Sequence, residues 1–316
     1  MKTLVLLLLG AAAVSAQAQT YASKPIHFVV PFPPSGATDI LTRVVGAQLE
    51  KALGQPVVIE NKPGAGGTIG TAYTAKAAPD GYTIQMATTS THSIGPALQK
   101  LPYDPERDFT PISQVASTPN LLVVSPALKI GSVKELIALA KAKPGQLNYS
   151  SSGEGTIVHL SGELFMRMAG VQLQHVPYKG TALAAADIKS GQIAMMIDNI
   201  VSAIPFMKSG MEQGVAVTSL KRSEILPNLP TVAETVPGYE SVTYFGVFAP
   251  AGVPPSIVSR LNSEIDRIVK APDVKAKLLD LGAEPVGGPP ENLAAAQRND
   301  FAKWSKVIKD AGVKPQ

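Results

Sequence analysis

The side chains best suited to bind a ligand lie in a turn at residues 150–156, which reads SSSGEGT. A strand-like segment precedes this turn and a helical pattern follows it, so unpaired backbone N–H groups at a helix N-terminus would join the hydroxyls. Hydroxyls and free amides together bind a carboxylate or a phosphate. We therefore predict that a carboxylate docks beside Ser151, Ser152 and Thr156. A plain helix cap is the alternative interpretation.

Three more turns combine polar or glycine residues with the end of a strand-like segment. They lie at residues 31–39, at the hydroxyl-rich residues 87–93, and at Asp198 and Asn199. Together with the first turn they make two for each half of the chain. Because ligands bind at the carboxyl ends of strands in open α/β sheets, the four turns predict a cleft between two lobes. If the turn at 150–156 does not hold the carboxylate, residues 88–93 are the next candidate.

Catalytic and metal-binding patterns are missing from the sequence. There is no G-x-S-x-G motif, no Ser-x-x-Lys pair and no cysteine, and the four histidines lack metal-site spacing. The loop at 64–70 resembles a dinucleotide loop but has Ile69 where that motif requires glycine. Asp198 with His92 or His159 is the only acid–base pair that we can suggest. We therefore predict a binding protein without a cofactor or metal, and an exported α/β enzyme is the alternative.

Composition narrows the class of protein further. The 316 residues are 45% hydrophobic and 16% charged, with a formal net charge of +4 and no run of lysine and arginine. This is typical of a globular chain, and a nucleic-acid partner would require a clustered basic patch.

The N-terminus has the pattern of a signal peptide, which we assign to residues 1–18. Lys2 precedes an apolar run at residues 4–14, and the small residues Ser15, Ala16 and Ala18 follow. No cysteine follows the run, so a lipid anchor at that position is excluded, and no later stretch approaches transmembrane length. We expect an exported, soluble, periplasmic protein.

Strand-like and helix-like segments alternate along the rest of the chain. We expect strands at residues 26–30, 55–60, 82–87, 112–116, 121–125, 147–150, 173–176, 193–197 and 242–248, and helices at 39–53, 68–77, 133–143, 157–169, 182–190, 256–270, 273–281 and 291–311. This order predicts an α/β fold with mostly parallel sheets flanked by helices. The chain would cross between lobes near 113–118 and 241–248. Lobe 1 would then comprise residues 19–116 and 242–316, with Trp304 as an anchor, and lobe 2 residues 117–241.

The sequence resembles the Bug (TctC-type) extracytoplasmic solute receptors of tripartite tricarboxylate transporters. The matching motifs cover nearly all of the mature chain: VVPFPP at 29–34, GATD at 36–39, ENKPGAGG at 60–67, APDGY at 78–82, LPYD at 101–104, KPG at 143–145, GEGTIVHL at 153–160, VPYKG at 176–180, LPTVAE at 229–234 and APAG at 249–252. Two departures are Ser35, where glycine is usual, and Glu154 with Ile157 and Val158, where small polar residues are common.

This resemblance implies a two-lobed type II periplasmic-binding-protein fold, a Venus flytrap that closes on a small carboxylate. The first turn would bind the ligand through backbone and ordered water, and the turn at 150–156 would receive a carboxylate. The ligand would be a di-, tri- or aromatic carboxylic acid, and the partners would be the membrane components of the transporter. We expect a monomer, and a sensor that feeds a signalling partner is a further alternative.

The turns and the resemblance together predict the following ligand-binding residues: Phe32, Pro33, Pro34, Ser35, Gly36, Ala37, Asp39, Thr89, Ser90, Ser151, Ser152, Gly155, Thr156, His159, Tyr178 and Asp198.

The signal peptide is open to a direct test. N-terminal sequencing of the exported protein should find a chain that begins just after the region of Ala16 and Ala18, because signal peptidase cleaves after small residues. A mature product that retains Met1 would contradict the assignment.

Overall fold

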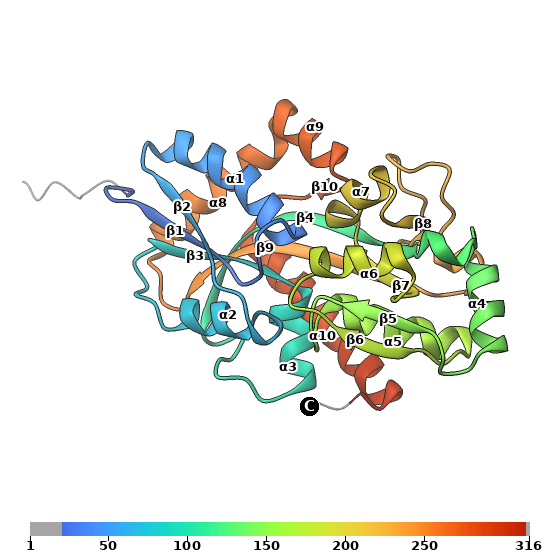
Figure 1. Ribbon diagram of the computed structural model, residues 1–316. Coiled ribbons are helices and arrows are strands. Elements are labelled where there is room, and N and C mark those ends of the chain that lie inside the picture. The colour runs from blue at the N-terminus through green and yellow to red at the C-terminus, as the bar shows by residue number, and fades with distance from the viewer. Residues whose placement is uncertain (1–20, 314–316) are drawn as a thin grey trace, which may run out of the picture.

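A computed structural model describes residues 21–313, which form a mixed α/β fold (Figure 1). The predicted signal peptide lies outside these residues. The strands are β1 (Ile26–Val30), β2 (Val57–Asn61), β3 (Thr83–Thr88), β4 (Phe109–Val124), β5 (Asn148–Ser151), β6 (Gln174–Pro177), β7 (Met195–Asn199), β8 (Gln213–Val217), β9 (Val242–Pro250) and β10 (Glu284–Pro285).

The helices cover both faces of these strands. They are α1 (Ala37–Leu53), α2 (Thr68–Ala75), α3 (Gly95–Leu98), α4 (Val133–Ala142), α5 (Ile157–Ala169), α6 (Ala185–Ser190), α7 (Ile200–Lys208), α8 (Pro255–Lys270), α9 (Pro272–Asp280) and α10 (Pro290–Ala311). Shorter helical turns are η1 (Ala65–Gly67), η2 (Ser90–Ile94), η3 (Pro126–Leu128), η4 (Thr181–Ala184) and η5 (Val232–Glu234).

The strands follow the order β2-β1-β3-β9-β4-β7-β5-β6, with β10 and β8 also paired to β4. Strands β2, β1 and β3 are parallel to one another, and so are β7, β5 and β6. The central strands β4 and β9 run antiparallel to each other and to their other partners. The expected α/β fold is therefore confirmed, and parallel pairing is confined to the outer strands.

β4 joins the two groups of strands. The two short strands expected at 112–116 and 121–125 are one strand of 16 residues, because the polar segment Ser117–Pro119 continues the pairing with β9 instead of turning. Up to Pro119 the partners are β9 and, at Ala116 and Ser117, β10, and from Asn120 onward they are β7 and β8. The lobe boundaries that we predicted remain a prediction, and this change of partners lies close to them.

Two further features differ from the expected elements or complete them. The segment after Asp198 and Asn199 is the helix α7, which we did not predict because Pro205 interrupts its pattern. Trp304 is fully buried on α10, as expected of an anchor. α10 packs against β4, η2 and α3, and also reaches α5. Among the helices in the described part of the chain, none is both long and apolar enough to cross a membrane.

Glu212, between α7 and β8, is an unusual member of the core. It is 2% exposed, and neither carboxylate oxygen has a hydrogen-bond partner among residues 21–313. Burial, together with the negative charge of Asp198, raises its pKa to about 8. A carboxylate in this environment destabilises the fold once it ionises.

Replacing Glu212 by glutamine should stabilise the protein increasingly as the pH rises. The folded-state pKa of about 8 exceeds the ordinary value of 4.5, so the wild-type protein loses stability between these values and the amide does not. The difference in unfolding free energy between variant and wild type should grow by about 2–4 kcal/mol from about pH 5 to about pH 8. Denaturant unfolding at both pH values measures this difference.

Glu224→Gln is the matched control, because Glu224 is exposed. It should show almost no change with pH. An equally flat result for Glu212→Gln would mean that Glu212 is solvated or paired.

Candidate functional site

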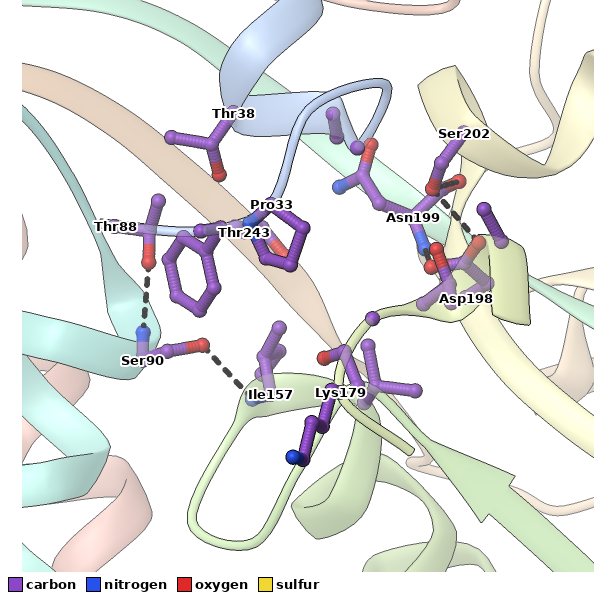
Figure 2. Close-up of a pocket in the computed structure, with 18 of the residues that line it drawn as sticks. Pro33, Thr38, Thr88, Ser90, Ile157, Lys179, Asp198, Asn199, Ser202 and Thr243 are labelled. Atoms are coloured by element: carbon purple, nitrogen blue, oxygen red, sulfur yellow. Dashed lines mark hydrogen bonds between the residues drawn. The ribbon is translucent and has the colours of Figure 1, made fainter. Parts of the chain in front are cut away.

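A cavity of about 190 Å³ lies between the two groups of strands (Figure 2). Its walls come from the β1–α1 turn, the end of β3 with η2, the start of α5, the segment 179–183, the β7–α7 junction and β9. The lining residues are Phe32, Pro33, Pro34, Gly36, Ala37, Thr38, Thr88, Ser90, Ser152, Ile157, Val158, Lys179, Gly180, Thr181, Ala182, Leu183, Asp198, Asn199, Ser202, Thr243 and Phe245.

The β1–α1 turn is held in place by Asp39. Its carboxylate accepts hydrogen bonds from the Ser35 amide (3.0 Å), the Asn61 side chain (3.0 Å) and Arg43 (3.0 Å). Asn61 also donates to the Phe32 carbonyl (3.1 Å). Although burial opposes ionisation, the bonds from Arg43, Ser35 and Asn61 outweigh it and lower the pKa of Asp39. Hydrogen bonds within the protein therefore fix the conformation of the turn without a ligand.

One end of the cavity is lined by hydroxyl groups from the first group of strands. Thr38, Thr88 and Ser90 lie together at this end in Figure 2, and all three are buried. The Thr88 hydroxyl accepts from the Ser90 amide (3.2 Å), and the Ser90 hydroxyl accepts from the Ile157 amide (2.9 Å). Both oxygens are thus fixed by backbone donors while their hydrogens remain free to donate to a ligand.

Three helices begin at the cavity wall. α1 begins after Gly36, which offers no side-chain cap, α5 begins after Thr156, and α7 begins after Asn199. The N-terminus of each helix carries a partial positive charge, which favours an anion. At α5 the Ile157 amide donates to Ser90 and the His159 amide to Thr156. At α7 the Val201 amide donates to Asn199, and the Asp198 carboxylate already lies at the start of the helix. No protein acceptor within the described residues takes the amides of Gly36, Ala37 and Thr38. The cavity therefore suits a negatively charged group.

The opposite end of the cavity is formed by the β7–α7 junction. Asp198, Asn199 and Ser202 lie there, across from the hydroxyl end (Figure 2). Asp198 is 1% exposed and accepts from the Ser202 hydroxyl (2.7 Å) and the Asn199 amide (2.7 Å). Burial raises its pKa to about 6, and these hydrogen bonds offset that effect only in part.

Between the two ends the walls are mainly apolar. Pro33 and Ile157 lie between the polar ends in Figure 2, and Phe32, Val158 and Phe245 also line the space. Lys179 and Leu183 are exposed, which places them at its mouth. The cavity can therefore hold a small molecule with a polar group at each end and an apolar body.

The two groups of strands contact each other around the cavity. The Ile157–Ser90 hydrogen bond joins them directly. Glycines permit further close approaches, since a Cβ atom on Gly66 would lie 2.7 Å from the Glu154 carbonyl oxygen and one on Gly180 would lie 3.2 Å from Pro33. The two walls of the cavity are therefore in contact with each other in this structure.

Comparison with known proteins identifies the family. The family model of the tripartite tricarboxylate transporter family receptor matches residues 41–313. The chain belongs to this receptor family. It is 37% identical over 300 residues to the protein BugT of Bordetella pertussis, covering 94% of this chain and 92% of BugT.

Three solved structures superpose closely on this one. R. palustris Rpa4515 with adipate has a TM-score of 0.91 at 39% identity, covering 94% of this chain and all of that chain. MatC from Rhodopseudomonas palustris with bound malate has a TM-score of 0.86 at 33% identity, covering 91% of this chain and all of that chain. The periplasmic binding protein BugD superposes with a TM-score of 0.88 at 35% identity, covering 94% of this chain and all of that chain. The periplasmic-binding-protein fold that we expected is therefore confirmed for this receptor.

The structure brings about half of the predicted ligand-binding residues of this receptor to the cavity wall. These are Phe32, Pro33, Pro34, Gly36, Ala37, Ser90, Ser152 and Asp198. The others lie outside the wall: Ser35, Asp39, Thr89, Ser151, Gly155, Thr156, His159 and Tyr178. Asp39 holds the first turn, and Thr89 donates to Asp300 on α10 (2.7 Å).

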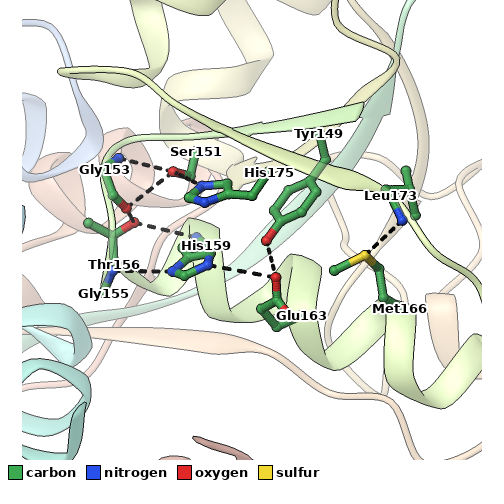
Figure 3. A network of polar contacts seen from close by, with 10 residues as sticks. All are labelled: Tyr149, Ser151, Gly153, Gly155, Thr156, His159, Glu163, Met166, Leu173 and His175. Carbon is green, nitrogen blue, oxygen red and sulfur yellow. Dashed lines mark hydrogen bonds and ion pairs between the residues drawn. The ribbon is translucent and has the colours of Figure 1, made fainter. Parts of the chain in front are cut away.

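The hydroxyls of the turn at 150–156 bond mainly within the turn (Figure 3). Thr156 donates to the Gly153 carbonyl (2.7 Å) and accepts from the His159 amide (3.4 Å). Ser151 accepts from the Gly153 amide (3.1 Å), and Ser152 donates to Thr156 (3.2 Å). Only Ser152 of these hydroxyl residues lines the cavity.

His159 and Tyr178 face a second, wider space of about 970 Å³, the outer groove, which residues 63–67, Glu154 and His175 also line. The His159 and His175 rings stack with centroids 4.0 Å apart, and burial lowers the pKa of His175 to about 4. Glu154 thus lines the outer groove and not the cavity.

The acid–base pair that we suggested from the sequence is not brought together. Asp198 lines the cavity and His159 lines the outer groove. His92 is fully buried against Phe109 and Phe248, with ring centroids 4.6 and 4.4 Å away, and burial lowers its pKa to about 3.

Several lining residues were not predicted. Thr38 and Thr88 lie within two of the turns that we selected, so choosing every hydroxyl of those turns would have found them. Thr243 and Phe245 come from β9, which the sequence shows only as a strand. No local signal marks these two, because only the pairing of β9 with β3 and β4 brings them to the cavity.

Ser35 has a backbone conformation that favours glycine, the residue that the family resemblance led us to expect at this position. Its φ is +68°, in the left-handed region that favours glycine, and it is exposed. Ser35→Gly should therefore stabilise the receptor by about 0.5–1 kcal/mol, since a Cβ atom in this conformation costs roughly 1 kcal/mol or more. Thermal unfolding should show a midpoint higher by about 1–4 °C. Ser35→Ala, which keeps the Cβ atom, should show no gain, and an equal gain would exclude strain as the cause.

Proposed function

We propose that this receptor is exported to the periplasm, captures a small carboxylate in the 190 Å³ cavity and delivers it to the membrane components of a tripartite tricarboxylate transporter. The observation that carries the proposal is the set of donors at the hydroxyl end of the cavity: the buried hydroxyls of Thr38, Thr88 and Ser90 and the amides at the N-terminus of α1, which have no acceptor within the described residues. The adipate and malate named for the two similar structures support a carboxylate ligand.

The carboxylate would bind at the hydroxyl end, beside Thr38, Thr88 and Ser90, with the free amides of the first turn of α1. The predicted residues that lie at the wall beside this end, Phe32, Pro33, Pro34, Gly36, Ala37 and Ser152, would shape the middle of the site. We favour the turn after β3 over Thr156 and its neighbours, since the hydroxyls of Ser151 and Thr156 donate to the Gly153 carbonyl and that of Ser152 donates to Thr156.

Binding would be coupled to closure of the two predicted lobes, residues 19–116 with 242–316 and residues 117–241. β4, β9 and α10 would act as the hinge, and Ser90 with Ile157 would form the contact that closure makes. We propose that the receptor acts as a monomer that binds its ligand without chemical conversion, with neither a metal nor a cofactor.

Thr38→Val tests the hydroxyl end directly. The Thr38 hydroxyl lines the cavity and has no hydrogen-bond partner among residues 21–313. Its loss should therefore weaken ligand binding without lowering the stability of the fold. A thermal-shift screen of mono-, di- and aromatic carboxylates first selects an acid. By calorimetry the variant should then bind that acid about 1–3 kcal/mol more weakly, as expected for a lost hydrogen bond to a charged group.

Thr235→Val is the matched control, because Thr235 is exposed and distant from the lining residues. It should leave affinity unchanged. If no carboxylate shifts the unfolding midpoint of the wild-type receptor, the proposed function is wrong. If Thr38→Val binds as well as the wild type, the carboxylate lies elsewhere in the cavity.

A further inference from the structure

Asp198 places a buried carboxylate inside a cavity that otherwise suits an anion. It is the acidic residue among those that line the cavity, and it is 1% exposed. The only lysine or arginine among the lining residues is Lys179, which is exposed. Within residues 21–313, no cation pairs with the Asp198 carboxylate. Its charge is therefore balanced by hydrogen bonds and by the N-terminus of α7 alone.

The carboxylate of Asp198 keeps acceptor capacity toward the cavity. One oxygen accepts from Ser202 (2.7 Å) and the other from the Asn199 amide (2.7 Å). The Thr181 side chain, which also lines the cavity, contributes a further hydrogen bond that lowers the pKa of Asp198. An ionised carboxylate has about four acceptor positions, so these bonds do not exhaust it. A buried acceptor that remains unfilled costs free energy, and a donor on a ligand would remove that cost.

The position of Asp198 defines which part of a ligand would meet it. The hydroxyl end, with Thr38, Thr88 and Ser90, lies across the cavity from Asp198 in Figure 2. A ligand whose carboxylate occupies the hydroxyl end would therefore direct its far end toward Asp198. Ser202 and Asn199, which flank Asp198, would hold the aspartate in the same orientation throughout.

We propose that Asp198 determines ligand specificity and selects a carboxylic acid that carries a hydrogen-bond donor, a hydroxyl or an amine, at the end opposite its carboxylate. This inference rests on the proposed function and narrows its ligand class. A dicarboxylate in its dianionic form would bring a second negative charge against Asp198, which is unfavourable in a buried site. The receptor would in this respect differ from the two neighbours solved with adipate and malate.

The test compares acids of equal length that differ only at the far end. At six carbons the probes are hexanoate, 6-hydroxyhexanoate, 6-aminohexanoate and adipate, and the four-carbon acids form a second set. Calorimetry on the wild-type receptor near neutral pH should rank the hydroxy or amino acid above both the plain acid and the dicarboxylate, by about tenfold or more.

Asp198→Asn then tests the residue itself. The amide still accepts a hydrogen bond but has no charge, so the amino acid should lose about tenfold or more in affinity while the dicarboxylate gains. The hydroxy acid should change less, which separates the two kinds of donor. Glu224→Gln is the matched control: it removes the charge of an exposed acid that does not line the cavity, and it should leave the ranking unchanged.

The outcomes are distinct. If dicarboxylates bind the wild-type receptor more tightly than the hydroxy and amino acids, the inference is overturned while the proposed function stands. The same holds if Asp198→Asn leaves the ranking as it was. If the wild-type receptor binds none of the carboxylates of either set or of the wider screen, the proposed function itself fails. If the Asp198→Asn variant does not fold, the affinity ranking of the acids on the wild-type receptor decides whether the proposed specificity is correct.

Discussion

The antiparallel pairing of β4 with β9 is the constraint on which the rest of the structure depends. β4 has 16 residues and pairs with β9 from Phe109 to Pro119 before it continues to β7 and β8. A single continuous strand therefore belongs to both groups of strands. Because a hydrogen-bonded strand resists stretching but can twist and bend, this arrangement fixes how far apart the two groups lie and still permits rotation.

The cavity follows from this arrangement. In each group, the parallel outer strands end beside the central pair, and the turns after β1, β3 and β7 meet across the gap. The closing contacts are backbone contacts at glycines and one backbone–hydroxyl bond, Ile157 to Ser90. Contacts of this kind need no large side chain, so the walls can approach closely while the space between them remains open for a ligand.

The two ends of the cavity differ in charge: the backbone supplies partial positive charge at one end, and the Asp198 side chain supplies negative charge at the other. The N-terminus of α1 and a set of hydroxyls favour an anion at one end, while Asp198, at the N-terminus of α7, disfavours a second anion at the other end. Burial and the charge of Asp198 together raise the pKa of Glu212, which does not line the cavity. These two buried acids thus link the chemistry of the site to the stability of the second group of strands.

The sequence by itself determined the family, most of the helices and strands, and the turns from which the cavity is built. These are local properties: α5 spans Ile157–Ala169 as predicted, because Thr156 caps its start and Gly170 ends it. Tertiary structure decided which side chains of each turn face the ligand. The turns at 150–156 and 88–93 have similar local patterns, yet Thr156 bonds within its own turn and Ser90 reaches the cavity. The continuity of β4, the helix α7 and the burial of Asp198 also depend on long-range pairing, which no local pattern encodes.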